Sequence, residues 1–95
     1  MEMSQDAMKD IEIIPLAKRK MERRGIPEAW VGEALRNADQ VAEGHGGRSV
    51  AQQRRRIRRR EMLLRVVFEE TEDKFVVITA YLTSDIKRYW KDKAP

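Results

Sequence analysis

Two stretches in the C-terminal half of the chain carry the clearest pattern of apolar and polar positions. Residues 62–70 (MLLRVVFEE) and residues 74–82 (KFVVITAYL) are rich in β-branched and aromatic side chains, and the polar sequence TEDK joins them. This pattern predicts a β-hairpin. Both faces of the strands hold apolar residues, with Leu63 on one side and Leu64 on the other. We therefore expect central strands that are covered, at least in part, on two sides.

The N-terminal half changes to a helical period after a short extended segment. Residues 11–15 (IEIIP) are β-branched and stop at a proline, which predicts a short strand. Residues 16–25 (LAKRKMERRG) place their apolar side chains on one helical stripe and end at a glycine, which is typical of a helix stop. A second helix is predicted over residues 27–37, because its proline suits a first helical turn.

The middle of the chain and its last residues complete the set of predicted elements. Residues 39–43 could form a short strand, and the glycines of residues 44–47 (GHGG) indicate a loop. A strand is predicted over residues 48–56, followed by a turn or a continuation of the strand over residues 57–60. Residues 83–90 (TSDIKRYW) favour a short closing helix, since a threonine or serine can cap its start.

The order of these elements is β-α-α-β-β-β-α, with residues 39–43 able to add a short strand. It predicts an α+β fold, in which two N-terminal helices pack on an antiparallel, hairpin-connected sheet and a short C-terminal helix closes the chain. A length of 95 residues suits one domain, which we place at residues 11–92. Residues 1–10 are polar and are expected to form a frayed tail.

Composition excludes several classes of function. Cysteine is absent, so we expect no disulfide, zinc knuckle or thiol nucleophile. The single His45 rules out an all-histidine metal site within one chain, and the acidic residues are scattered singly, so we expect neither a metal nor a cofactor. The N-terminus lacks the order of a signal peptide, and no apolar run approaches the roughly 18 residues of a membrane span. A soluble, cytoplasmic protein is the expectation.

Positive charge is concentrated in one segment. The chain has 20 Lys+Arg and 16 Asp+Glu, a net charge of +4, yet residues 48–65 hold eight arginines and one acid, Glu61. Six of these arginines occupy seven consecutive positions: Arg54, Arg55, Arg56, Arg58, Arg59 and Arg60. Guanidinium groups bind phosphate oxygens in a bidentate manner, so this run predicts a nucleic-acid-binding hairpin. The alternative is a solvated hairpin tip whose repulsion is reduced by Glu69, Glu70 or Glu72.

Three segments taken together resemble a prokaryotic family known as domain of unknown function 4258. They are LAKRKMERRGIPEAWVGEAL, LLRVVFEE and VVITAYLTSDIKRYW, and the resemblance extends over about residues 11–91. The family's helical signature reads His-Ala-x-x-Arg-Met-x-x-Arg-Gly-Ile. In this chain Leu16 stands at the position of the histidine and Lys20 at that of the first arginine. Five residues match the signature: Ala17, Met21, Arg24, Gly25 and Ile26.

The resemblance implies a fold similar to that of the RelE/BrnT group of toxin ribonucleases, with a sheet whose open face binds RNA. If the signature histidine transfers protons in the family, this chain has lost that group, because Leu16 cannot titrate. A catalytic site would then depend on Arg65, Tyr81, Lys20 and Arg24. Arginine would stabilise the pentacoordinate phosphate while lysine or tyrosine moves protons.

The residues themselves lend this site some support. Arg65 is the one charge inside an apolar strand, and Thr79 and Tyr81 share a face of the next strand. Together they could form the polar floor of a groove, with Lys20 and Arg24, one helical turn apart, as its wall. The alternative is an ion pair of Arg65 with Glu69 or Glu12, which would leave the tyrosine as a packing residue.

Four further side chains have two interpretations. His45 could act as a general acid or base beside its flexible glycines, although a single histidine in such a loop is more often simply exposed. Trp30, Tyr89 and Trp90 could stack on bases, or could pack a helix onto the sheet. We favour a core position for Trp30 and leave Trp90 open.

Three hypotheses of function result. The first in order of support is an RNA- or nucleic-acid-binding domain that uses the arginine-rich hairpin. The second is a ribonuclease of the toxin type. The third is a domain whose basic hairpin binds an acidic protein partner, as an antitoxin would be.

Overall fold

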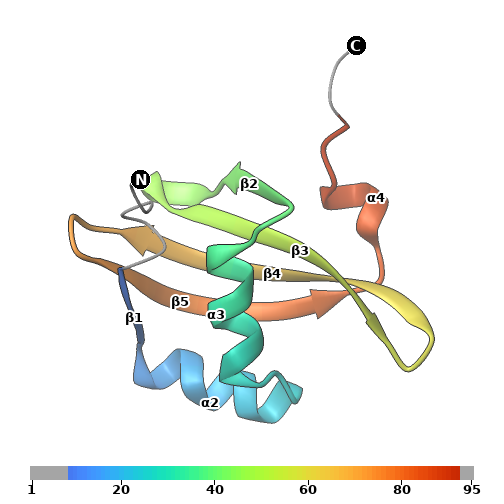
Figure 1. Cartoon of the computed structure of the whole chain (residues 1–95), viewed down its shortest axis with the longest axis horizontal. Helices are drawn as coiled ribbons and strands as arrows, with labels where there is room; N and C mark the ends of the chain where they lie inside the picture. Colours follow the sequence, from blue (N-terminus) through green and yellow to red (C-terminus); the bar gives the residue numbers. More distant parts are fainter. Residues whose placement is uncertain (1–8, 93–95) are drawn as a thin grey trace, which may run out of the picture.

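The computed structural model describes residues 9–92 and arranges them as a five-stranded sheet with three α-helices (Figure 1). In chain order the elements are β1 (Asp10–Ile13), α2 (Pro15–Arg24), α3 (Glu28–Arg36), β2 (Gln40–Glu43), the 3-10 helix η1 (His45–Gly47), β3 (Ser49–Ile57), β4 (Arg60–Glu70), β5 (Lys74–Thr83) and α4 (Ile86–Tyr89). The predicted α+β class is confirmed. Of the tail expected at residues 1–10, Asp10 belongs to β1, and residues 1–8 lie outside the described residues.

The strands lie in the order β1-β5-β4-β3-β2. Strands β2 to β5 pair antiparallel, but β1 is parallel to β5, with Ile11 opposite Phe75 and Ile13 opposite Val77. The prediction of a wholly antiparallel sheet is therefore wrong, and the sheet is mixed. The local pattern could not give the direction of β1, because alternation of apolar and polar residues is the same in both directions and the partner strand is distant in sequence.

Helices α2 and α3 cover one face of the sheet, here called the core face (Figure 1). The main apolar cluster lies between these two layers and consists of Ala17, Met21, Ile26, Val31, Ala34, Ala51, Leu64, Val66, Phe68, Phe75, Val77 and Ala80. The predicted helix stop at Gly25 is confirmed: its φ is 68°, and the next N–H, of Ile26, donates to the carbonyl of Met21 at 2.9 Å. This turn directs the chain from α2 into α3.

The opposite side of the sheet, here called the second face, is covered only in part. Its fully or nearly buried residues lie outside the main apolar cluster and are Ala42, Val50, Gln52 and Leu63. The C-terminal segment is held there by two glutamines. Gln52 Nε2 donates to the carbonyl of Tyr89 at 3.2 Å, and Gln40 Oε1 accepts from the N–H of Lys91 at 3.0 Å. The predicted closing helix is thus present, and it is pinned to β2 and β3.

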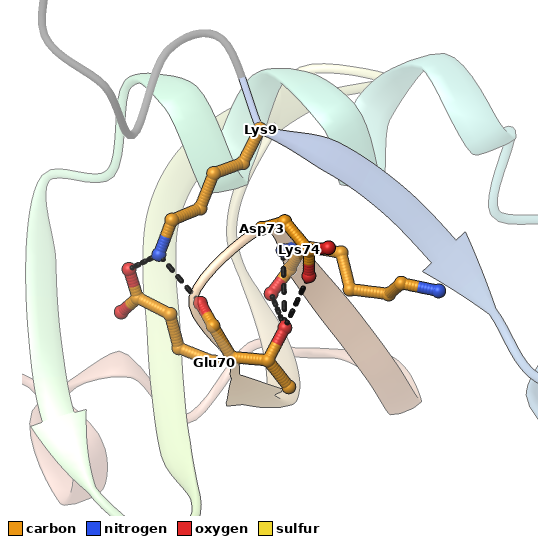
Figure 2. A network of polar contacts seen from close by, with 5 residues as sticks. Lys9, Glu70, Asp73 and Lys74 are labelled. Carbon is orange, nitrogen blue, oxygen red and sulfur yellow. Dashed lines mark hydrogen bonds and ion pairs between the residues drawn. The ribbon is translucent and has the colours of Figure 1, made fainter.

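The turn between β4 and β5 is stabilised by a polar network that also fixes the start of β1 (Figure 2). The ammonium group of Lys9 donates to Glu70 Oε2 at 2.6 Å and to the carbonyl of Thr71 at 2.8 Å. The hydroxyl of Thr71 lies 3.2 Å from Asp73 Oδ1 and accepts from the N–H of Lys74 at 3.1 Å. The sequence TEDK is therefore a turn, as its composition predicts, and β1 enters the sheet beside it.

Candidate nucleic-acid interface

The β3–β4 hairpin extends beyond the rest of the sheet (Figure 1). The last residue of β3 that pairs with β2 is Gln52, and the first residue of β4 that pairs with β5 is Leu63. Residues 54–62 are here called the arginine arm. Arg54 still pairs with Leu63, whereas residues 55–62 pair only with each other. From residue 55 to residue 62, both outer edges of this two-stranded ribbon lack a neighbouring strand.

A two-residue loop closes the arm. Ile57 pairs with Arg60, and the residues between them, Arg58 and Arg59, have φ angles of 51° and 69°. Two consecutive positive φ angles define the type I′ loop, in which Asn-Gly is the favoured pair because a Cβ atom is disfavoured there. Left-handed backbone costs a residue with a side chain roughly 1–2 kcal/mol. The tip therefore keeps two arginines in positions where other residues would be more stable.

Two arginines of the run have structural roles. The guanidinium of Arg55 lies 4.4 Å from the ring centroid of Trp30 and donates to Gln53 Oε1 at 2.8 Å. On the other side of the ribbon, the guanidinium of Arg54 lies 4.2 Å from the ring centroid of Trp90. These contacts join the base of the arm to α3 and to the end of α4. Trp30 also packs against the main apolar cluster, as expected.

The other four arginines of the run project into solvent. Arg56, Arg58, Arg59 and Arg60 are exposed, and within residues 9–92 none of their side chains has a hydrogen bond, an ion pair or a ring contact. Glu69 pairs with Arg48 at 3.1 Å and Glu70 with Lys9 at 2.6 Å, and Glu72 has no ion pair within the described residues. The carboxylates proposed to reduce repulsion in the run are therefore not bonded to these four side chains.

A second polar site lies on the second face, around Arg65. Its Nε donates to Gln52 Oε1 at 2.7 Å, its Nη1 donates to the hydroxyl of Tyr81, and its guanidinium lies 4.0 Å from the ring centroid of Tyr89. The suggested ion pairs with Glu69 and Glu12 are wrong, because these acids pair with Arg48 and Lys74. All of the described partners of Arg65 are neutral.

The groove beside this cluster, here called the Arg65 groove, has a volume of about 500 Å³. Its lining consists of Glu43, Gly44, His45, Arg48, Val50, Arg65, Val67 and Tyr81. Sequence reasoning brought Arg65 and Tyr81 together correctly, since the two are a cross-strand pair. It did not place His45 beside them. His45 belongs to the 3-10 helix between β2 and β3, and the position of that segment over the sheet leaves no local signal in the sequence.

The helix residues expected to form the wall of this groove lie elsewhere. Arg24 Nη1 donates to the carbonyl of Ala80 at 2.9 Å and lies 3.3 Å from Thr79 Oγ1, so it covers the edge of β5 next to α2. Neither Lys20 nor Arg24 is among the residues that line the groove. The catalytic assignment made from the sequence stays a prediction, and its four residues do not share this groove.

The described residues contain neither a cluster suited to a metal ion nor a helix suited to a membrane. Within residues 9–92, no group of three or more His, Cys, Asp or Glu side chains is arranged so that it could hold a metal ion. None of the helices in that part of the chain has the length and apolar character needed to span a membrane.

The fold and these two sites define a small α+β domain with a basic hairpin arm. The chain belongs to the family described as Domain of unknown function (DUF4258), whose model matches residues 17–82, more than half of its length. The resemblance noted from the sequence is therefore confirmed. A comparison with curated proteins and one with solved structures gave no match.

Proposed function

We propose that this protein binds single-stranded RNA through the arginine arm. The observation that carries the proposal is the set of four exposed guanidinium groups, those of Arg56, Arg58, Arg59 and Arg60, which have no partner within residues 9–92. Phosphate oxygens are natural partners for such groups, because the guanidinium fork donates two parallel hydrogen bonds. Arginine can also stack on unpaired bases, which single-stranded RNA offers and a duplex does not.

The backbone at the tip supports a binding role for these charges. Arg58 and Arg59 occupy left-handed positions that destabilise the fold, and their side chains make no hydrogen bond, ion pair or ring contact with the described residues. Strained backbone is commonly kept where it serves function. In solution the four charges repel one another, and a phosphate chain lying along the ribbon would relieve that repulsion.

The test is a salt titration of RNA binding measured by fluorescence anisotropy. Each phosphate neutralised in single-stranded RNA adds about 0.7 to the slope of log affinity against log salt. In a variant with Arg56, Arg58, Arg59 and Arg60 changed to glutamine, we expect the affinity to fall at least tenfold and the slope to drop by as much as ~3. Affinity that does not change with salt would overturn the proposal.

A control of equal charge separates the arm from general basicity. Outside the arm, the side chains of four exposed basic residues chosen for this control also have no described partner: Lys18, Arg19, Arg23 and Lys87. Their change to glutamine removes the same net charge, and we expect most of the affinity to remain. Equal losses in the two variants would contradict a specific role of the arm, as would tighter binding to a duplex of the same sequence.

The other two hypotheses have less support. A ribonuclease of the RelE/BrnT type would need proton-transfer groups beside Arg65. Tyr81 and His45 line that groove, but Lys20 and Arg24, which the catalytic assignment also requires, do not. Fragmentation of the RNA during the titrations, lost in Arg65→Ala, would favour it. An acidic protein partner could also bind the arm. Such a partner would co-purify in fixed stoichiometry with the native chain and would resist displacement by RNA.

A further inference from the structure

The Arg65 groove presents a cation that no carboxylate within the described residues neutralises. Arg65 is half-buried on a central strand, and its described contacts are a glutamine oxygen, a tyrosine hydroxyl and a tyrosine ring. Half-buried arginines usually pair with an acid, because an unpaired charge away from water is costly. The neutral partners hold the guanidinium in one orientation without cancelling its charge. An anion can therefore bind it without first displacing a carboxylate.

Donor capacity remains for such an anion. A guanidinium has five N–H groups, and the described hydrogen bonds of Arg65 use one at Nε and one at Nη1. The hydroxyl of Tyr81 accepts from Nη1, which leaves its own proton free to point at a ligand. Both side chains line the groove. An oxygen placed there can therefore accept from a charged and a neutral donor together.

The rest of the groove favours an organic ligand over a simple ion. Val50 and Val67 share the face of Arg65 and give the groove an apolar floor. Gly44 and His45 also belong to the lining. The volume of about 500 Å³ falls within the approximate 300–1,000 Å³ range of small-molecule sites. A flat ring with an attached phosphate would use both the floor and the cation.

The remaining charges of the groove limit how many phosphates it accepts. Arg48 is already paired with Glu69 at 3.1 Å, and Glu43 adds a negative charge to the lining. The guanidinium of Arg65 is thus the main group that can bind a phosphate in this groove. A ligand with a single phosphate suits it, whereas a triphosphate would bring negative charge close to Glu43.

From this geometry we infer that the Arg65 groove binds a nucleoside monophosphate, with the phosphate on Arg65 and Tyr81 and the base over Val50 and Val67. This site lies apart from the arginine arm. Tyr89 contacts Arg65 while the next residue, Trp90, contacts Arg54, so the end of α4 lies between the groove and the arm. The inference does not depend on RNA binding by the arm.

The test is a titration of 15N-labelled protein with AMP, followed by amide chemical shifts. We expect saturable shifts at Val50, Arg65, Val67 and Tyr81, with a Kd on the order of 1 mM or below. Adenosine and inorganic phosphate should each bind at least about tenfold more weakly, since each lacks one of the two contacts. Shifts confined to the arm, no saturation, or tighter binding of ATP than of AMP would overturn the inference.

Two variants locate the phosphate. Arg65→Gln should lower the affinity for AMP by a factor of about ten or more, because a hydrogen bond to a charged group is lost. Tyr81→Phe keeps the ring and removes only the hydroxyl, so it tests the same contact if Arg65→Gln does not fold. Unchanged AMP affinity in a folded variant of either kind would overturn the inference. The arm variant with four glutamines should bind AMP as the native chain does, which separates this site from the proposed RNA-binding surface.

Discussion

Leu63 and Leu64 are neighbours on β4, and each is fully buried, but they belong to different environments. Leu64 points to the core face and joins the apolar cluster beneath α2 and α3. Leu63 points to the second face, where Gln52 and Arg65 lie close by and the four-residue helix α4 gives partial cover. One face of the sheet therefore holds the fold together, while the other combines burial with polar groups that can bind a ligand.

The two faces differ in how freely the elements that cover them can shift when a side chain of the sheet is changed. Two helices of ten and nine residues cover the core face, and their packed side chains leave little freedom to rearrange. The cover of the second face rests on the short α4 and on hydrogen bonds of Gln40 and Gln52. A change on the second face can therefore be accommodated without disturbing the main core. The predictions below test this difference, from the largest expected effect to the smallest.

The largest expected change in the free energy of unfolding comes from replacing Leu63 and Leu64 one at a time. Leu64→Ala should lower the free energy of unfolding by about 3–5 kcal/mol, at the upper end for buried leucines, because the helices cannot collapse into the cavity. Leu63→Ala should cost less, about 2–3 kcal/mol, because α4 can shift toward the space. Urea denaturation of both variants measures the difference. Equal costs would contradict the division into a rigid and an adjustable face.

The adjacent residues Gln52 and Gln53 lie on opposite faces of the sheet, so they compare how much buried polar groups stabilise each face. Gln52 is fully buried on the second face and bonds to Gln40, Tyr89 and Arg65, so Gln52→Ala should cost about 2–3 kcal/mol by leaving these groups unpaired.

The matched control is Gln53→Ala on the core face. Gln53 is 8% exposed and bonds to the carbonyl of Asn37 and to Arg55. This arginine keeps its contacts with Glu33 and Trp30, so the expected loss is smaller, about 1 kcal/mol. Thermal unfolding ranks the two variants, and a larger loss for Gln53→Ala would reverse the comparison.

The tip of the arm, where neither face of the ribbon is covered, should respond in the opposite direction. The double change Arg58→Asn and Arg59→Gly supplies the favoured type I′ pair and should raise stability by about 1–2 kcal/mol. The same change should weaken RNA binding. The single change Arg56→Gln, on regular strand backbone, should leave stability within about 0.5 kcal/mol. A less stable double variant would show that the tip arginines make contacts that stabilise the fold.

The smallest effect concerns the edge of the second face. Lys74 donates to Glu12 Oε1 at 3.0 Å, and this hydrogen bond and charge raise the pKa of Lys74 above its ordinary value. A raised pKa means that the contribution to stability is complete below the ordinary lysine value and is lost as pH rises through the folded value. Lys74→Met should therefore be slightly less stable than the native chain at neutral pH.

That difference should shrink as pH rises above the ordinary lysine pKa of about 10.4, because the lysine of the unfolded chain loses its proton there and the native lysine only at a higher pH. Melting temperatures of both proteins between neutral and strongly alkaline pH measure it. A difference that stays constant through this range would contradict a contribution from the charged pair.

Most of the fold followed from local patterns. The turn TEDK, the helix stop at Gly25 and the two long strands were each predicted from a few neighbouring residues, because turn chemistry and apolar alternation act over short distances. The direction of β1 did not follow, since its pairing with β5 joins residues about sixty positions apart. Long-range pairing leaves no local signal beyond the alternation itself.

The candidate sites divide in the same way. A dense run of arginines was visible in the sequence, but only the structure separates Arg54 and Arg55, which stack on tryptophans, from the four that are open to solvent. The meeting of Arg65 with Tyr81 was anticipated from strand alternation. The presence of His45 in the same groove was not, because it depends on how a loop between two other strands folds over the sheet.

The sequence by itself determined where strands and helices form, which family the chain belongs to and where its positive charge is concentrated. Those properties depend on residue type and short-range spacing, which the chain carries in any conformation. Tertiary structure alone decided which charges are neutralised, which lie in a groove and which strand lies beside β5. These depend on distances between residues far apart in the chain, and only folding sets such distances.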